Sequence, residues 1–287
     1  MRTLNLIGAG HVGRVFGRLI AAGAVLQVRD VLTRSAASAQ QAVAFITAGS
    51  SSDSGDVAAP RAIDSYAQLR QADIYMLAVG DDQIAPACAA LAAAVPLQGA
   101  IVFHCSGALA SDQLEAARAA GALVASVHPI RSFADPAAVA ADFAGTWCGI
   151  EGDTGALAVL NPALQALGAQ PVAIDAAAKT VYHAAAVFAS NYLVTVLDAA
   201  LRAYQAAGIP EAVARQLAQP LAVESMANVF RLGAAPALSG PVARGDYATV
   251  ERQQQAVTQW DAATGELYRA LVAPTAALAA RKRAGSA

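Results

Sequence analysis

The sequence predicts an α/β protein in which helices cover both faces of a parallel sheet, followed by an all-helical segment. Short apolar runs alternate with segments of helical periodicity over residues 1–174, as is typical of parallel strands joined by helices. After residue 175 the strand signals stop, and long alanine-rich segments with apolar residues at helical spacing follow. We therefore expect two domains, residues 1–174 and 175–287.

Composition indicates a globular protein with a large core. The chain has 287 residues, of which 56% are hydrophobic and 14% charged, and its net charge is -2. This balance argues against a dedicated nucleic-acid binder, and the short cluster 281–283 is typical of a solvated helix end. Cys88, Cys105 and Cys148 show neither metal-ligand nor disulfide spacing. We expect no metal site and a reducing, cytoplasmic compartment.

One uncharged segment, 180–197, is long enough to cross a bilayer. It carries Tyr182, His183, Ser190 and Asn191 and stands alone, which favours a buried helix in a soluble protein. The N-terminus lacks a basic region followed by an apolar core and a cleavage site, so we expect no signal peptide. No membrane partner is therefore predicted.

A glycine turn near the N-terminus gives the first functional prediction. Residues 8–13 read Gly-Ala-Gly-His-Val-Gly, between an apolar strand and a segment of helical periodicity. In that context GxGxxG predicts a dinucleotide site rather than an ordinary turn. Gly8 permits the tight turn, Gly10 leaves room for a pyrophosphate, and Gly13 lets helix and strand pack closely.

The helix that follows this turn is expected to present free N–H groups to the phosphates. His11 and Val12 lie where that helix begins, so both are candidate cofactor contacts. We expect His11 to pack against the cofactor or to bond to it, and not to transfer a proton.

The end of the second predicted strand, 25–32, distinguishes NADP from NAD. NAD sites usually place an acid here for the ribose 2′-hydroxyl. Asp30 is at about the right distance but falls inside the strand, whereas the tip offers Thr33, Arg34 and Ser35. An arginine can hold a 2′-phosphate through two N–H bonds, so the sequence favours NADP. The alternative for Arg34 is a surface loop residue.

Ligands of parallel sheets bind beyond the carboxyl ends of the strands. Further strands are expected at 73–79, 100–105, 123–127, 146–150 and 171–174, with a helix at 154–167 before the last. Val79 and Ser106 lie where two of these strands end and are candidate cofactor contacts, while His104 is expected to be structural. The segment 49–60, rich in Ser, Gly and Asp, indicates an exposed loop.

In the second half, helices are expected at about 176–207, 210–232 and 247–281. Gly208-Ile209-Pro210 predicts a helix end followed by a helix start.

The glycine turn, the turn at 78–82 and the helical second half resemble the dehydrogenases related to 6-phosphogluconate dehydrogenase. This group includes β-hydroxyacid dehydrogenases, ketopantoate reductase, pyrroline-5-carboxylate reductase and prephenate dehydrogenase. Residues 128–133, 182–186 and 240–246 more closely resemble Rossmann-like oxidoreductases with a C-terminal helical domain of unknown function. The resemblance covers nearly the whole chain. It implies a Rossmann fold and a nicotinamide cofactor, but no particular substrate.

The β-hydroxyacid relatives use a lysine and an asparagine one helical turn apart. Lys179 and His183 have this spacing and share a helix face, although His183 replaces the asparagine. When hydride reaches a carbonyl or imine carbon, a nearby cation or acid stabilises the charge on the heteroatom and donates a proton. Either residue is a candidate donor. The alternatives are a lysine with its amine in water and a core histidine.

Prephenate dehydrogenases carry a pair similar to His128-Pro129, whose histidine contacts substrate, so His128 is a candidate catalytic residue. The glycine that follows the pair in those enzymes is absent here. A turn fixed by Pro129 is the alternative.

Three further residues are candidate substrate contacts. Ser190 falls within about 20° of Lys179 around the helix axis, and Asn191 is rotated further round, toward nicotinamide or a neighbouring helix. Arg244 is suited to bind a carboxylate bidentately. Its alternatives are a pair with Asp246 or a cap on the next helix.

Together these patterns predict an NADP-dependent oxidoreductase for a small, anionic carbonyl, imine or hydroxyl substrate. The alternative is a catalytically silent NADP-binding protein, acting as a redox sensor or partner-binding module. A hydrolase or transferase lacks support, because the sequence has no GxSxG elbow, metal-ligand cluster or P-loop. The helices are apolar on more than one face, and related enzymes bury such faces against a second subunit, so we expect a homodimer.

Overall fold

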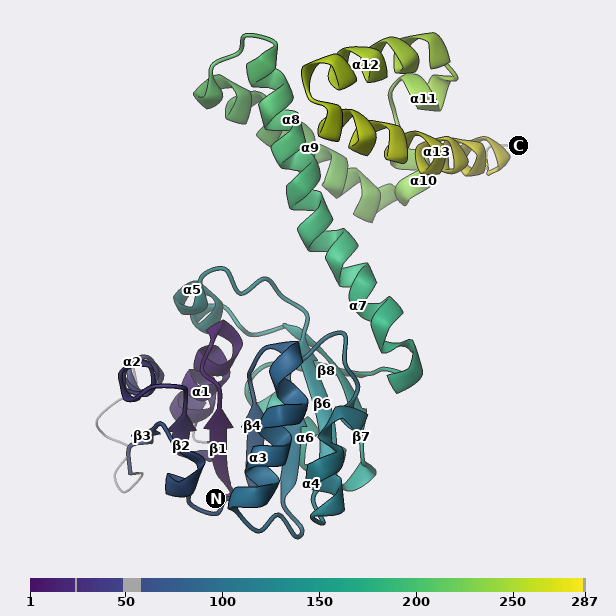
Figure 1. Ribbon diagram of the computed structural model, residues 1–287. Helices are drawn as coiled ribbons and strands as arrows, with labels where there is room; N and C mark the ends of the chain where they lie inside the picture. Colours follow the sequence, from purple (N-terminus) through teal and green to yellow (C-terminus); the bar gives the residue numbers. More distant parts are fainter. Residues whose placement is uncertain (24, 49–57, 286–287) are drawn as a thin grey trace. The chain divides into compact units, whose positions relative to one another are not determined.

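The computed structural model describes residues 1–23, 25–48 and 58–285, which form two compact units, Met1–Phe188 and Ala189–Ala287 (Figure 1). Most of the loop expected at 49–60 lies outside the described residues. The first unit extends past the expected domain boundary at residue 174, because helix α7 (Lys179–Val187) is hydrogen-bonded to the sheet through Lys179 and Tyr182.

The first unit contains an eight-stranded sheet in the order β3-β2-β1-β4-β5-β6-β7-β8. In chain order the strands are β1 (Thr3–Ile7), β2 (Gln27–Leu32), β3 (Arg61–Ile63), β4 (Ile74–Leu77), β5 (Ile101–His104), β6 (Leu123–Pro129), β7 (Trp147–Gly152) and β8 (Gln170–Ala173). The predicted α/β class with a doubly wound sheet is confirmed. The three-residue strand β3 had no counterpart in the predicted elements.

One pairing in the sheet departs from the expected parallel arrangement: β7 runs antiparallel to β6, while the other neighbours pair parallel. The connection between these strands contains only the short helix α5 (Pro136–Ala141), and Ile130 N–H donates to Trp147 O where β6 ends and β7 begins. The chain therefore re-enters the sheet at the edge that it has just left. No crossover helix precedes β7, and a parallel strand would need one.

Helices cover both faces of the sheet (Figure 1). They are α1 (His11–Gly23), α2 (Ala36–Thr47), α3 (Ile84–Ala94), α4 (Glu115–Ala119), α5 and α6 (Thr154–Ala166). One buried cluster joins α1, α2, α5 and α6 to the sheet, with Phe16 and Leu160 among its members. A second joins α3 and α4 to the sheet, with Leu91 and Val102 among its members. These two apolar layers hold the strand ends in fixed positions.

The second unit is helical, as predicted. Beyond a π-helical turn at Phe188–Tyr192 it contains α8 (Leu193–Ala206), α9 (Glu211–Leu232), α10 (Ala234–Ala237), α11 (Pro241–Arg244), α12 (Tyr247–Trp260) and α13 (Ala262–Ala284). Gly208, with φ of 87°, lies between α8 and α9 at the predicted helix end. The helix predicted at 247–281 is broken at Asp261, whose extended backbone ends α12 and whose carboxylate caps α13.

The prediction of a buried helix at 180–197 is wrong for the single chain. Val181, Phe188 and Val194 are 75%, 69% and 65% exposed. Residues 176–206 are long and apolar enough to cross a membrane by length and composition, and only 6% of the most apolar window is buried. These side chains are thus largely exposed in the single chain, although their apolar character predicts burial.

Candidate active site at the carboxyl edge of the sheet

The glycine turn has the backbone geometry that the motif requires. Gly8 has φ of 84°, and its N–H donates to Leu32 O over 2.8 Å, so the turn is fixed against β2. An added Cβ on Gly8 would lie 2.5 Å from Ala78 O. An added Cβ on Gly13 would lie 2.7 Å from Gly8 O, so the helix packs closely on the turn.

Gly10 differs from its two partners because an added Cβ there would meet no atom within 4 Å. Helix α1 begins one residue later, at His11. Open space above Gly10 beside a helix N-terminus is what a bound pyrophosphate requires. The residues of the turn therefore fit a dinucleotide.

Val79 and two residues of the turn itself, His11 and Val12, were expected to contact a cofactor. The side chain of Val79 lies over Gly8, since an added Cβ there would be 2.6 Å from Val79 Cγ1. Val12 packs against the core. His11 Nδ1 lies 2.6 Å from Phe133 O, so this ring is bonded to the segment after β6.

At the tip of β2, only Arg34 has a side chain without a partner among the described residues. Thr33 Oγ1 donates to Ser35 O over 2.9 Å, and Ser35 Oγ accepts from Ser38 N–H at the start of α2. These hydroxyls shape the turn, and Arg34 is exposed beside them.

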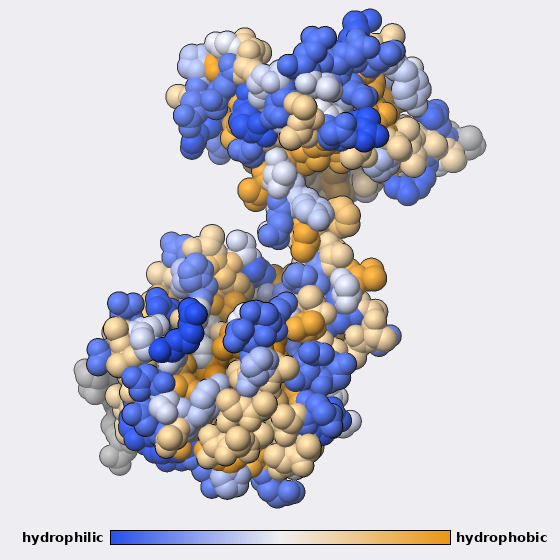
Figure 2. Space-filling view, in the orientation of Figure 1, coloured by the Kyte–Doolittle hydropathy of each residue, from blue (hydrophilic) through white to orange (hydrophobic). Residues whose placement is uncertain are grey.

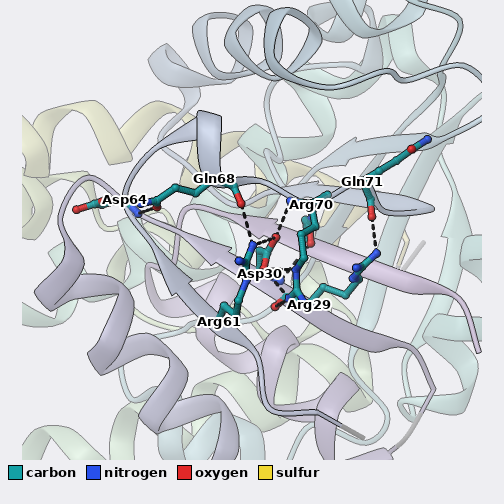
Figure 3. A network of polar contacts seen from close by, with 8 residues as sticks. Arg29, Asp30, Arg61, Asp64, Gln68, Arg70 and Gln71 are labelled. Carbon is teal, nitrogen blue, oxygen red and sulfur yellow. Dashed lines mark hydrogen bonds and ion pairs between the residues drawn. The ribbon is translucent and has the colours of Figure 1, made fainter.

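Asp30 is buried beneath this tip in an ion network (Figure 3). Its carboxylate accepts from Arg61 Nε over 2.9 Å, and from Arg70 through Nη2 over 2.7 Å and backbone N–H over 2.8 Å. Burial alone would raise the pKa of Asp30, but the hydrogen bonds from Arg61 and Arg70 outweigh it and lower the pKa. Asp30 is therefore engaged inside the sheet, as its position within the strand predicts.

Lys179 is buried, with 1% of its side chain exposed. Its Nζ donates to Ser126 Oγ and lies 3.3 Å from Glu151 Oε1. The carboxylate of Glu151 also accepts from Ser111 N–H over 2.8 Å and from Ser111 Oγ over 2.7 Å. Burial lowers the pKa of Lys179, and Glu151 partly opposes this effect. The alternative of an amine in water is excluded.

Sequence reasoning missed Ser111, Ser126 and Glu151. The available signal was weak: Ser126 and Glu151 are lone polar residues in buried strands, where a polar side chain needs a partner, and Ser111 begins a short 3-10 helix. Only the register of the strands shows which partner each has.

His128 and His183 lie together near the end of β6. Their ring centroids are 5.5 Å apart, and His128 Nδ1 lies 2.8 Å from Tyr182 Oη. An added Cβ on Gly107 would be 2.7 Å from His128 Nε2 and would overlap His183 Cδ2. The structure therefore brings together two of the three predicted catalytic residues beside the loop that follows β5.

The register of β6 and β7 explains both groups. Ser126 pairs with Glu151, and His128 pairs with Gly149. Residues two apart on a strand face the same side of the sheet. Helix α7 crosses this side with Lys179 at the first pair and Tyr182, three residues later, at the second.

Ser106 is a structural residue of the loop that carries Gly107. Its Oγ accepts from the backbone N–H groups of Ala108 and Leu109 over 3.2 and 3.0 Å. His104 accepts from Ser106 N–H at Nδ1, and burial lowers the pKa of His104 to about 4. The expectation that His104 is structural is confirmed.

The predicted substrate contacts Ser190, Asn191 and Arg244 belong to the second unit. All three are exposed, the first two in the π-helical turn and Arg244 at the end of α11. Asp246 caps α12 by accepting from Thr249 N–H over 3.1 Å. No ion pair joins Arg244 to Asp246 in the part of the chain that the structure describes.

Comparison with known proteins supports the fold. Residues 146–275 match the family described as domain of unknown function (DUF2520). A search of curated proteins finds no match. Among solved structures, a candidate NADP oxidoreductase from Bacteroides fragilis has a TM-score of 0.77 at 18% identity, covering 96% of this chain and 98% of that one.

Two further solved structures cover nearly the whole chain. A protein from Thermotoga maritima has a TM-score of 0.71 at 24% identity, covering 98% of this chain and 99% of that one. An imine reductase from Myxococcus stipitatus in complex with NADP+ has a TM-score of 0.63 at 15% identity, covering 99% and 94%. The chain thus has the fold of these Rossmann-type proteins, with a helical C-terminal region, and its residues 146–275 are similar to the DUF2520 family.

Proposed function

We propose that this protein is an NADP-dependent oxidoreductase for a small, anionic carbonyl, imine or hydroxyl substrate. The observation that carries the proposal is the glycine turn: Gly10 faces open space at the start of α1, while Gly8 and Gly13 fit only as glycines. Structures of similar fold include an NADP+ complex of an imine reductase and a pyrroline carboxylate reductase with NADP bound.

Preference for NADP follows from two charged residues at the tip of β2. Asp30 is held by Arg61 and Arg70 inside the sheet, so it is not available to a ribose hydroxyl. Arg34 is exposed and unpaired among the described residues, so it is available to a 2′-phosphate. With this arrangement, NADP binding meets little repulsion from Asp30 and gains a charge-assisted contact between Arg34 and the 2′-phosphate.

The glycine turn and Arg34 would hold the dinucleotide, which would supply hydride to the substrate carbon and leave negative charge on the heteroatom. We assign the neutralisation of that heteroatom to the His128–His183 pair, which lies at the carboxyl edge of the sheet. His183 is our candidate for the proton donor in reduction and the acceptor in oxidation. Lys179 is buried under this edge and paired with Glu151, so we assign it a supporting role in holding α7 on the sheet.

The second candidate function, a silent NADP-binding sensor, shares the turn and Arg34 but makes no use of the histidine pair. A structural core histidine has partners for both ring nitrogens, as His104 has. We favour the enzyme because His128 and His183 lie side by side without such a full set of partners among the described residues.

We also propose that the protein acts as a homodimer. Large apolar side chains are exposed along α7, the π-helical turn and α9, including Val181, Phe188, Leu221 and Phe230. Figure 2 shows such apolar surface on the helical unit between polar areas. A second copy is the simplest cover for helices apolar on several faces.

Titration with NADPH and NADH tests the cofactor assignment. We expect NADPH to bind more tightly, and Arg34→Ala to weaken NADPH about tenfold or more while leaving NADH nearly unchanged, because a charge-assisted pair is lost. Arg215→Ala removes an exposed guanidinium from the second unit and serves as the control. Equal affinity of the wild-type protein for both dinucleotides would refute the role of Arg34.

In the same preparation, keto acids, imines and hydroxy acids are screened by NADPH absorbance. His183→Ala is expected to bind NADPH as the wild type does and to lose turnover by about 100-fold or more, the usual range for a general acid. Unchanged turnover in His183→Ala would show that the proton donor is wrongly assigned. NADPH binding without turnover on any substrate would favour the sensor.

A further inference from the structure

His128 and Tyr182 meet at the end of β6, with Nδ1 and Oη 2.8 Å apart and the rings edge to face. One of these two atoms donates the shared proton. The choice decides what His128 offers at its other nitrogen, because a neutral imidazole carries one N–H only.

The surroundings of Tyr182 favour one direction for this hydrogen bond. A phenol hydroxyl has one proton to give and two lone pairs. The phenol oxygen packs against Gly149, where an added Cβ would overlap Oη. If Nδ1–H of His128 donated to Oη, the phenol proton would have no acceptor among the described residues. The phenol proton is used when Oη–H donates to Nδ1.

We propose that Tyr182 is a positioning residue that fixes His128 as the neutral tautomer with its proton on Nε2. The contact lies inside the first unit and involves α7, β6 and β7. In its catalytic consequence the inference rests on the proposed function, because it defines what His128 presents to a substrate.

The charges around the pair agree with this geometry. Burial, then the neighbouring His183 and Lys179, lower the pKa of His128 to about 4, against a weak opposing effect of Asp81. Burial raises the pKa of Tyr182 to about 12. Near neutral pH the imidazole is therefore uncharged and the phenol keeps the proton that it donates.

The Nε2 side of the ring is open to a ligand. It faces Gly107, where an added Cβ would be 2.7 Å from Nε2. Nε2 makes no hydrogen bond within the described residues, and among them Asn161 Oδ1 is the one buried side-chain nitrogen or oxygen left unpaired. Nε2 is therefore reached by solvent, and its N–H is directed out of the protein's own network.

A neutral imidazole of this kind donates a hydrogen bond without giving up its proton. It stabilises negative charge that grows on a carbonyl oxygen or imine nitrogen. Proton transfer then falls to His183, so the two adjacent rings have different tasks. Gly107 is required in this arrangement, since any side chain there would occupy the space between them.

Nitrogen-15 NMR of the imidazoles in the full chain, without cofactor, tests the proposal. The chain has four histidines, and His128→Asn identifies the signals of His128. We expect wild-type His128 near pH 7 to show a protonated Nε2 and an unprotonated Nδ1. In Tyr182→Phe we expect a mixture of both tautomers, because the donor to Nδ1 is gone.

Two controls accompany this measurement. His104 also accepts at Nδ1, from Ser106 N–H, so its signals should not change in Tyr182→Phe. Tyr66→Phe removes another half-buried hydroxyl of the first unit and should leave His128 as in the wild type.

A wild-type His128 protonated at Nδ1 would overturn the proposal, even if the variant failed to fold. An unchanged tautomer in folded Tyr182→Phe would overturn it as well. Because no dinucleotide is present, the result is independent of the titration above: the expected tautomer in a protein that binds no NADPH would refute the proposed function alone.

Discussion

Lys179 shows how a single residue can match a catalytic pattern and yet be enclosed. Its amine is held between Ser126 and Glu151, and Glu151 is held in turn by Ser111. A buried ion pair of this kind is strongly coupled, because removal of one partner leaves the other charge without compensation. We regard this network as the anchor that fixes α7 on the sheet.

The Lys179–Glu151 pair gives a prediction for stability. Glu151→Gln should lower the free energy of unfolding by about 3 kcal/mol, because a buried ammonium loses its counter-charge. The double variant Lys179→Met/Glu151→Gln should recover much of that loss, since neither charge then remains. Urea unfolding of the two single variants and the double variant measures the coupling.

Additive effects in this cycle would contradict the anchor. Arg269→Gln breaks an exposed pair with Glu266 and is the matched control, for which little change is expected.

At the scale of single residues, the sequence identified the groups with a local pattern and missed those with none. Lys179 and His183 were found from their spacing along one helix, and His128 from a His-Pro pair at a strand end. Tyr182 and Glu151 became visible only when β6 and β7 were paired. Their partners are distant in sequence, so no periodic pattern in the sequence predicts these contacts.

Among the elements, the turn from β1 to α1 is the one whose function follows most directly from local geometry. Its three glycines have different tasks, because Gly8 and Gly13 are enclosed by backbone atoms and Gly10 is open. The same element therefore contains two positions that support the fold and one that supports binding.

Substitution of these glycines by alanine separates the two tasks. Gly13→Ala should destabilise the protein by about 1–3 kcal/mol, because the new methyl would press on Gly8 O. Gly10→Ala should change stability by no more than about 0.5 kcal/mol but weaken NADPH about tenfold, because the methyl enters the space for the phosphates. Thermal unfolding and NADPH titration measure both effects.

Equal destabilisation by the two substitutions would show that Gly10 is not open. Unchanged NADPH affinity in a folded Gly10→Ala protein would place the dinucleotide elsewhere.

Helix α7 was predicted as part of one longer helix at 176–207, and its environment was not predicted correctly. Its apolar residues suggested a buried helix, whereas one face holds Lys179 and Tyr182 against the sheet and Val181 is exposed. Hydrophobicity predicts that a face is covered, and does not say whether the cover is the same chain.

For the whole molecule, the exposed apolar faces are the feature that the single chain leaves unexplained. On α9, for example, Leu221, Val223 and Phe230 are 60%, 55% and 90% exposed. Soluble monomers rarely leave so many large apolar side chains uncovered, and a second copy offers matching surface.

Sedimentation at micromolar concentration tests the dimer. We expect the wild type to sediment as a dimer and Phe230→Asp to shift it toward monomer, because a charge would be buried in an apolar interface. Gln71→Glu adds the same charge to an exposed position of the first unit and should leave the dimer intact. A wild-type monomer would contradict the proposal.

The sequence by itself determined the alternation of strands and helices in the first half, apart from β3, as well as the glycine turn and the change to an all-helical second half. These are local: a hydrophobic period, a glycine with positive φ or a capping residue acts within a few positions of the chain. Only the tertiary structure decided that β7 runs antiparallel to β6, that Asp30 forms ion pairs with two arginines, and that Tyr182 hydrogen-bonds His128. Such contacts depend on strand register and on which face each side chain takes, and these follow from packing across the sheet.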